Sequence, residues 1–368
     1  MIGRLLRFVL WCATALAAAG FLALAAHALS EPVTHDPLEA TILERATRVA
    51  EDRPLFTDAG AEPATALMPG LPLVVSVFVR LFDARLWEPR LVSLLAIAGA
   101  ALLVAIVVRI ETKSATLGAA GATVLLMGQG LIAGAPAVAR PESLAFLLAL
   151  LGLCTIRYAP GIWGALLAIF PVTAACFTHP HALWFAAAGL VHLAVHDRRR
   201  FFAHALGLVA LLGGTHVLLW LTVGPWYNYE AWDVFLQALH FAPVPLLSYV
   251  GTQLLGPLGV FTLATVLAFT LPVRPWRGAV GLWTWLGFAA LGAGIAATQS
   301  GAEMEDALRP AAFALALLGP ISIQRVTQHL SAWPGSSRMA GQRVMLTALV
   351  LQFLTLFASA ASLHLGNG

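Results

Sequence analysis

Long apolar runs separated by short polar segments make up most of this sequence. A bilayer core about 30 Å thick needs about 20 apolar residues of helix to cross it. Runs of roughly this kind lie near residues 8–28, 91–108, 115–134, 142–158, 161–178, 182–196, 202–223, 246–271, 279–298, 307–323 and 344–364. The pattern predicts an all-α polytopic membrane protein, a single integral domain over residues 1–368 with about 11 transmembrane helices.

The composition supports this class of protein. Of the 368 residues, 60% are hydrophobic and only 11% are charged, against about one quarter charged in soluble domains. Cys12, Cys154 and Cys176 lie inside apolar runs without paired spacing, so neither a disulfide framework nor a thiolate metal site is predicted. The net charge of +3 predicts no nucleic-acid partner, because arginines in membrane proteins are first of all topology signals.

The distribution of charge predicts the orientation. Arg4 and Arg7 precede an apolar run longer than the core of a typical signal peptide, so we expect an uncleaved signal anchor with a cytoplasmic N-terminus. The cytoplasmic side then holds 13 cations and 2 acids (+11), and the outer side holds 8 cations and 16 acids (−8). With one lysine against 20 arginines, a usage typical of GC-rich bacteria, the sequence predicts a multi-pass protein of a bacterial inner (plasma) membrane, surrounded by membrane lipids.

The acidic segment 30–89 is predicted to be the first outer loop and to contain interfacial helices. Residues 37–51 repeat apolar side chains at Leu38, Ile42, Ala46 and Val49, opposite Glu44, Arg45 and Arg48. A helix with such a face lies flat in the headgroup region. The apolar stretch 70–82 is too short to span a bilayer, so it is also read as interfacial or re-entrant.

Two acids follow the first apolar run directly. In His35-Asp36-Pro37-Leu38-Glu39, Asp36 fits a helix N-cap, with proline at the first helical position and Glu39 three residues after the cap. A carboxylate at the mouth of a helical bundle also suits a general base that deprotonates an acceptor hydroxyl. Both interpretations can hold together, because the cap fixes the position of Asp36.

Three arginines at helix ends on the same outer side are candidate phosphate ligands. Arg90 opens the second apolar run, Arg140 precedes Pro141 and Glu142, and Arg309 opens a later run. Fixed guanidinium groups stabilise the charge that develops on a phosphate leaving group. Each arginine can instead pair with a neighbouring acid or extend to lipid headgroups.

The remaining outer segments give weaker signals. His179 and His181, two residues apart, suit contact with phosphate or with an acid, or form a plain polar turn, and lack the further ligands that a zinc site needs. The aromatic loop 224–233 is typical of a membrane-interface belt, with sugar stacking as the alternative. Acids at 303, 305 and 306 can hold a divalent cation, but their spacing does not demand one, so no cofactor is predicted.

The order of these motifs resembles the GT-C superfamily of polyprenyl-phosphate-sugar-dependent glycosyltransferases, in the protein O-mannosyltransferase-like and RgtA-like branch. The matching stretches are His35-Asp36-Pro37-Leu38-Glu39 to Arg53-Pro54-Leu55-Phe56, Met68-Pro69-Gly70-Leu71-Pro72-Leu73, Arg90-Leu91-Val92-Ser93, Ala139-Arg140-Pro141-Glu142-Ser143-Leu144-Ala145 and Phe177-Thr178-His179-Pro180-His181-Ala182-Leu183. They cover about the first half of the chain, with 90–223 as the helical core and 224–368 as a variable set of C-terminal helices.

The resemblance implies an inverting transfer of a sugar from a polyprenyl-phosphate donor to an envelope lipid, glycan or protein acceptor on the periplasmic side. The resemblance carries roles over to Asp36 as the first-loop acid, to Arg90, to Arg140 with Glu142 and to the position of His179. Together with the residue-based candidates, the predicted site has Asp36 and Glu39 as catalytic residues, Arg90, Arg140, His179 and Arg309 around the donor phosphate, and Glu142 and His181 as supporting residues. Two departures stand out. Pro37 and Leu38 separate acids that are often adjacent in the family, and His179 stands where related sequences often carry lysine.

Two other functions fit the same outer charges. A transporter or flippase of lipid-linked intermediates would share the arginines and the interfacial helices, and so would a non-catalytic subunit of an envelope polysaccharide complex. Ion-coupled transporters usually keep ionisable groups near the bilayer midplane. Here nearly every such group lies at a helix end or in a loop, which favours an enzyme.

Overall fold

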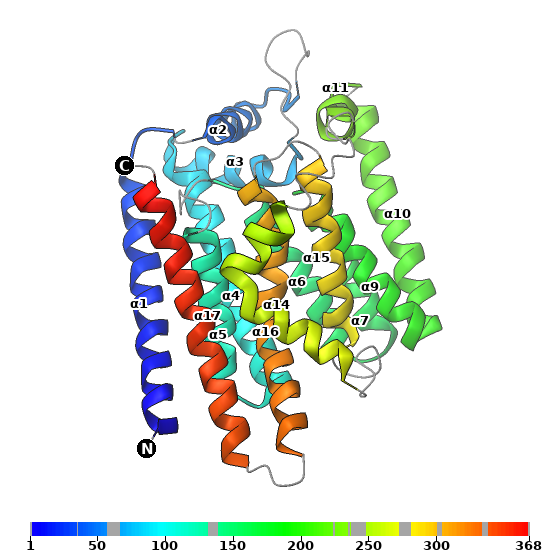
Figure 1. Ribbon diagram of the computed structural model, residues 1–368. Helices are drawn as coiled ribbons and strands as arrows, with labels where there is room; N and C mark the ends of the chain where they lie inside the picture. Colours follow the sequence, from blue (N-terminus) through cyan, green and yellow to red (C-terminus); the bar gives the residue numbers. More distant parts are fainter. Residues whose placement is uncertain are drawn as a thin grey trace.

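A computed structural model describes residues 2–34, 36–56, 67–131, 139–223, 225–234, 236, 248–271, 281–299, 304–332 and 338–366, and these residues form helices and short connections (Figure 1). The elements are α1 (Ile2–Ser30), α2 (Pro37–Ala50), α3 (Gly70–Phe82), α4 (Trp87–Thr112), α5 (Ala115–Leu131), α6 (Pro141–Tyr158), α7 (Gly161–Leu167), α8 (Ile169–Cys176), α9 (Ala182–His196), α10 (Arg198–Val223), α11 (Pro225–Asn228), π-helices η1 (Tyr229–Asp233) and η2 (Tyr249–Leu254), α14 (Leu255–Thr270), α15 (Gly281–Gln299), α16 (Met304–Ser331) and α17 (Arg338–Gly366).

The predicted class, an all-α polytopic membrane protein, is confirmed. Among the described residues, six helical stretches are long and apolar enough to cross a bilayer. They are Arg7–Ser30, Trp87–Thr112, Pro141–Tyr158, Arg198–Thr222, Gly281–Thr298 and Ala340–Ala358. The other predicted runs correspond to shorter apolar helices and to α16, so the total of about 11 spanning helices stays a prediction.

One predicted run, 161–178, is split into α7 and α8 at Ala168. Pro171 lacks an N–H and its ring clashes with the carbonyl four residues earlier. That carbonyl belongs to Leu167, the last residue of α7. The break therefore has a local cause that the apolar pattern alone did not include.

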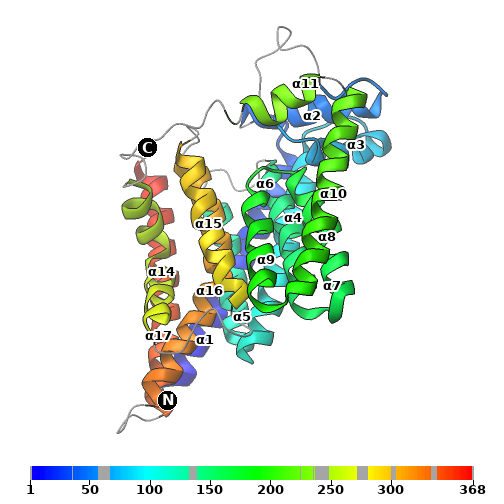
Figure 2. The same ribbon diagram turned by 90° about the vertical axis from the view of Figure 1, so that its right-hand side faces the viewer.

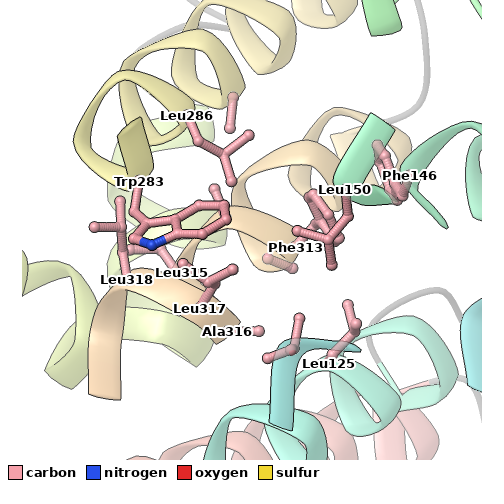
Figure 3. Close-up of a cluster of buried hydrophobic side chains, with 14 of the residues drawn as sticks. Leu125, Phe146, Leu150, Trp283, Leu286, Phe313, Leu315, Ala316, Leu317 and Leu318 are labelled. Atoms are coloured by element: carbon pink, nitrogen blue, oxygen red, sulfur yellow. The ribbon is translucent and has the colours of Figure 1, made fainter. Parts of the chain in front are cut away.

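Helix α16 lies at the centre of the apolar core, where it packs against α4, α5, α14, α15 and α17. Its Phe313 ring stacks on Phe146 of α6 with a centroid distance of 4.8 Å, and Trp283 of α15 is fully buried (Figure 3). Gly319 of α16 lets the Phe261 ring approach closely, because a Cβ there would lie 2.2 Å from a ring carbon. Small residues at helix crossings are typical of packing in membranes.

A buried glutamine explains the kink in α14. Gln352 of α17 accepts a hydrogen bond from the Phe261 N–H (2.9 Å) and donates one to the Pro257 carbonyl (2.6 Å), and Leu258 between them has non-helical angles. These two backbone groups would bond to each other in a regular helix. The side-chain amide is thus inserted into the hydrogen-bond ladder, which is one of the known causes of helix kinks.

Helices α2 and α3 lie across one end of the bundle, named here the α2/α3 end, and the N-terminus lies at the opposite end (Figures 1 and 2). Helix α3 buries Leu71 and Val75 and exposes Leu73 and Val77, as expected of an interfacial helix. Helix α2 differs from the prediction at Arg45. That residue was expected on the polar face, but it is buried because it pairs with Glu230 of η1.

We predict that Gln352→Leu destabilises the protein by about 1–3 kcal/mol, because inside the apolar core the Phe261 N–H loses its partner and the Pro257 carbonyl keeps only the longer bond from Thr355 Oγ1 at 3.3 Å. The unfolding midpoint in detergent measures this loss. Gln328→Leu, at an exposed position of α16, is the matched control. Equal midpoints for the Gln352→Leu variant and the unmodified protein would contradict the account of the kink.

Candidate active site

All eight predicted site residues lie at the α2/α3 end, and five of them, on the ends of different helices, form the candidate site. Asp36 is the N-cap of α2, Arg140 is the N-cap of α6, and Glu142 is in the first turn of α6. His179 is in the turn between α8 and α9, and Arg309 is in the N-terminal part of α16. The sequence separates these residues by up to 273 positions, so the fold brings them to one end of the bundle.

The centre of the site is an ion pair between Asp36 and Arg140. Arg140 Nη2 lies 2.7 Å from Asp36 Oδ2, and the two side chains are 16% and 21% exposed, respectively. The other carboxylate oxygen of Asp36 accepts the Leu38 N–H at 2.8 Å, which is the N-cap bond that the sequence predicted. Partial exposure leaves both charged groups within reach of a ligand.

Glu142 joins this pair to further positive charges. Its Oε1 lies 3.6 Å from His179 Nε2, and its carboxylate also interacts electrostatically with Arg140 and Arg309. Glu142 and Arg309 are 8% and 6% exposed. Two arginines and a histidine therefore surround one largely buried carboxylate, an arrangement that suits an anionic ligand entering among the cations.

The rings of His179 and His181 form an edge-to-face pair with an interplanar angle of 68°. Their ring centroids are 4.5 Å apart, and the His181 N–H donates to His179 Nδ1 at 3.3 Å. The accepting Nδ1 places the proton of a neutral His179 ring on Nε2, which faces Glu142. Burial, and then the nearby His179, lower the pKa of His181 to about 3, so His181 is neutral at physiological pH.

Glycine is required where the first loop contacts the histidine turn. The Gly70 N–H donates to the Phe177 carbonyl at 2.7 Å, and a Cβ at Gly70 would lie 2.5 Å from Thr178 Oγ1. The start of α3 thereby packs directly on the segment that leads to His179. Two motifs that are far apart in the sequence form one contact.

Arg90 and Glu39 lie together, but outside this site. Both side chains are fully buried in a bidentate ion pair, Nη2–Oε2 at 2.7 Å and Nε–Oε1 at 2.9 Å. The other Arg90 donors bond to the carbonyls of Ala28, Glu31 and Val33, each at 2.7 Å. All five donors of the guanidinium are in use. The geometry leaves Arg90 no donor for a phosphate and Glu39 no access to a substrate, which argues against the roles predicted for them.

Sequence reasoning missed a second buried ion pair, between Arg45 of α2 and Glu230 of η1. The Arg45 guanidinium also lies over the Phe56 ring at 5.5 Å, and that ring contacts Tyr227 at 5.6 Å. The pair fixes α2 to the aromatic segment 225–233. Helical spacing in fact puts Arg45, three residues after Ile42, beside the apolar face rather than opposite it, but its partner lies 185 positions away and no local pattern identifies it.

The side chains that the structure describes do not form a metal site. Within the described part of the chain, three or more metal-ligating side chains do not come together. The acids at 303, 305 and 306 lie outside the residues whose side chains are described.

An apolar cavity of about 400 Å³ lies between α14, α15 and α16. Its lining includes Leu291 and Ile295 of α15 and Ala311, Ala314 and Leu318 of α16. Ala311 is two residues from Arg309, so the cavity reaches the level of the charged site along α16. We name this space the α14–α16 groove.

Comparison of the structure with solved structures gives clear likenesses. The fold is similar to that of ArnT from Cupriavidus metallidurans bound to undecaprenyl phosphate, with a TM-score of 0.62 at 12% sequence identity over 94% of this chain and 77% of ArnT. The apo state of the same protein gives a TM-score of 0.58 at 14% identity over 94% of this chain and 75% of ArnT.

Sequence comparisons add nothing to this result, because neither a protein-family model nor a curated protein matches the chain. The similarity between this chain and ArnT is therefore a similarity of fold. It extends over nearly the whole chain, beyond the first half that carries the sequence motifs. The chain shares the fold of ArnT over most of its length, which agrees with the fold that the resemblance of its motifs implied.

Proposed function

We propose that this protein is a glycosyltransferase that moves a sugar from a polyprenyl-phosphate donor to a hydroxyl group of an envelope lipid, glycan or protein. The observation that carries the proposal is the Asp36–Arg140 pair, with Glu142, His179 and Arg309 beside it at one end of the bundle. The fold supports it, because ArnT, a protein of the same fold, has been crystallised with undecaprenyl phosphate.

In the proposed reaction, Asp36 accepts the proton of the acceptor hydroxyl as its oxygen attacks the anomeric carbon of the sugar. The bond from that carbon to the phosphate oxygen breaks, and the phosphate leaves with the electron pair. Attack from the face opposite the leaving group inverts the configuration. Asp36 suits this role because its carboxylate is partly exposed and held in place by the N-cap bond.

Arg140, Arg309 and His179 are proposed to bind the donor phosphate. Negative charge accumulates on the leaving phosphate in the transition state, and cations that are already fixed stabilise it without reorganisation. Arg140 contacts both Asp36 and the cluster around Glu142, so it links the base to the phosphate site. Glu142 and the neutral His181 orient these cations.

The α14–α16 groove is proposed to hold the prenyl chain of the donor. Its lining is almost entirely apolar, and on α16 it extends from Ala311, near Arg309, to Leu318. A prenyl chain can follow this surface while its phosphate stays at the charged end, because the groove is as apolar as the lipid that the chain leaves. This places the polar and apolar parts of one lipid next to matching parts of the protein.

Charge supports a periplasmic location for the α2/α3 end. The N-terminus, with Arg4 and Arg7, lies at the opposite end of the bundle (Figure 1). The connection that carries Arg109 and Lys113, between α4 and α5, lies at that same end. By the positive-inside rule, that end is cytoplasmic, and the site faces the periplasm.

Asp36→Asn is expected to lower product formation by roughly 10²–10⁴-fold and to leave donor binding in place, since only proton abstraction is lost. Asparagine is also a good N-cap, so α2 keeps its start. Turnover and binding of the purified protein with its lipid-linked donor measure the two effects. Asp52→Asn, at the exposed end of α2, is the control. Full activity of the Asp36 variant would exclude Asp36 as the base, whereas no product from the unmodified protein would favour a transporter or a scaffold.

Arg140→Ala is expected to weaken donor binding and to slow turnover together, by roughly 10²-fold in kcat/KM, because the cation contacts phosphate in both the ground and the transition state. Steady-state kinetics with purified donor give both parameters. Arg53→Ala, which removes an exposed arginine of the same loop, is the control. If kcat and KM are both unchanged, Arg140 does not belong to the site.

Leu291→Trp is expected to fill part of the α14–α16 groove and to raise KM severalfold for a long-chain donor, with little change for a donor of two or three isoprene units. Leu206→Trp, at a position of α10 that is 70% exposed, is the matched control. Kinetics with the two donor lengths make the comparison. An equal effect on both donors would show that the prenyl chain lies elsewhere.

A further inference from the structure

A single serine holds the backbone of Arg140. Ser93 Oγ, on α4, accepts the Arg140 N–H at 3.0 Å and donates to the Arg140 carbonyl at 3.2 Å. Ser93 is 4% exposed, so water does not readily replace these bonds. Arg140 is an N-cap with extended backbone angles and no capping bond from its own side chain. The Ser93 hydroxyl therefore provides the hydrogen-bond acceptor for the backbone N–H of Arg140 at the start of α6.

The residue before Arg140 is held from α2. Glu39 Oε1 accepts the Ala139 N–H at 2.8 Å as well as Arg90 Nε, and Ala139 is fully buried. Glu39 stands three residues after Asp36, within the same first turn of α2. One carboxylate thus connects the helix that begins at Asp36 to the segment that presents Arg140.

Arg90 extends this connection to α1. Its three bonds to backbone carbonyls hold the end of α1 and the following segment against the start of α4. Ser93 lies three residues after Arg90, on the same face of α4. We refer to Ser93, Arg90 and Glu39 as the α4 brace.

We propose that the α4 brace positions Asp36 and Arg140 relative to each other, with Ser93 as the positioning residue that sets the direction of the Arg140 side chain. The inference rests on the proposed function, in which Asp36 is the base. None of the three residues touches the substrate. Each acts on the backbone next to Asp36 or Arg140 and not on the substrate directly.

The test compares steady-state kinetics of sugar transfer for variants of the full-length protein in nanodiscs. The donor is the undecaprenyl-phosphate-linked sugar whose product is missing from the envelope of a deletion strain, as identified by mass spectrometry. Ser93→Ala removes both hydrogen bonds to Arg140. We expect kcat/KM to fall about tenfold or more, with kcat lowered and donor KM raised together, because the Arg140 guanidinium is no longer directed at the donor phosphate. Ser93→Thr, which retains a hydroxyl, restores both.

Two further variants complete the test. Ser76→Ala is the matched control, because Ser76 is also buried and its described bond is to a carbonyl of its own helix, that of Leu73. It should leave kcat and KM unchanged. Ser93→Cys has a weaker donor and acceptor and should give an intermediate effect, which provides a second measurement if the alanine variant folds poorly.

Unchanged kcat and KM per folded molecule in Ser93→Ala or Ser93→Cys would overturn the inference. Such a result alongside an inactive Asp36→Asn variant would leave the proposed function intact. No sugar transfer by the unmodified protein would instead remove the proposed function itself.

Discussion

The buried ion pair between Arg90 and Glu39 is the interaction on which the candidate site depends. A guanidinium enclosed in an apolar bundle is tolerated when every donor has a partner, and here five acceptors from α1, α2 and the segment between them supply those partners. The same carboxylate holds the backbone next to Arg140. The start of α2, which carries the proposed base, and the start of α6, which carries the proposed phosphate ligand, are fixed to one charged group.

The structure divides the arginines at this end into two kinds. Arg90 and Arg45 are enclosed and paired with carboxylates from distant segments, so they hold helices together. Arg140 is partly exposed and lies among opposing and like charges, which leaves it able to meet an anionic ligand. Removing a partner from a buried pair is costly because an uncompensated charge remains. The partly exposed Arg140 is thereby carried by helices that the buried ion pairs of Arg90 and Arg45 hold together.

Much of the architecture follows from local pattern. The apolar runs correspond to helices in the structure, and the Asp36-Pro37 cap begins α2 as the residues predicted. The grouping of Asp36, Arg140, Glu142, His179 and Arg309 was expected from their common side of the bundle, and the structure brings them to the same end.

Pairing between distant segments accounts for most of what sequence reasoning missed, whereas the break at Ala168 has a local cause. Arg90 looked like a phosphate ligand because the sequence does not show that Glu39 and three carbonyls saturate it. Arg45 looked like part of a polar face because Glu230 is far away in the chain. The insertion of Gln352 into α14 is invisible to hydropathy for the same reason.

The most direct measurement is a cryo-electron microscopy structure of the protein in nanodiscs with undecaprenyl phosphate. The account predicts the phosphate within about 3 Å of donors of Arg140 and Arg309, with the prenyl chain in the α14–α16 groove and Arg90 still paired with Glu39. A phosphate bound at the other end of the bundle, or an Arg90 side chain turned from Glu39 to contact it, would contradict the account.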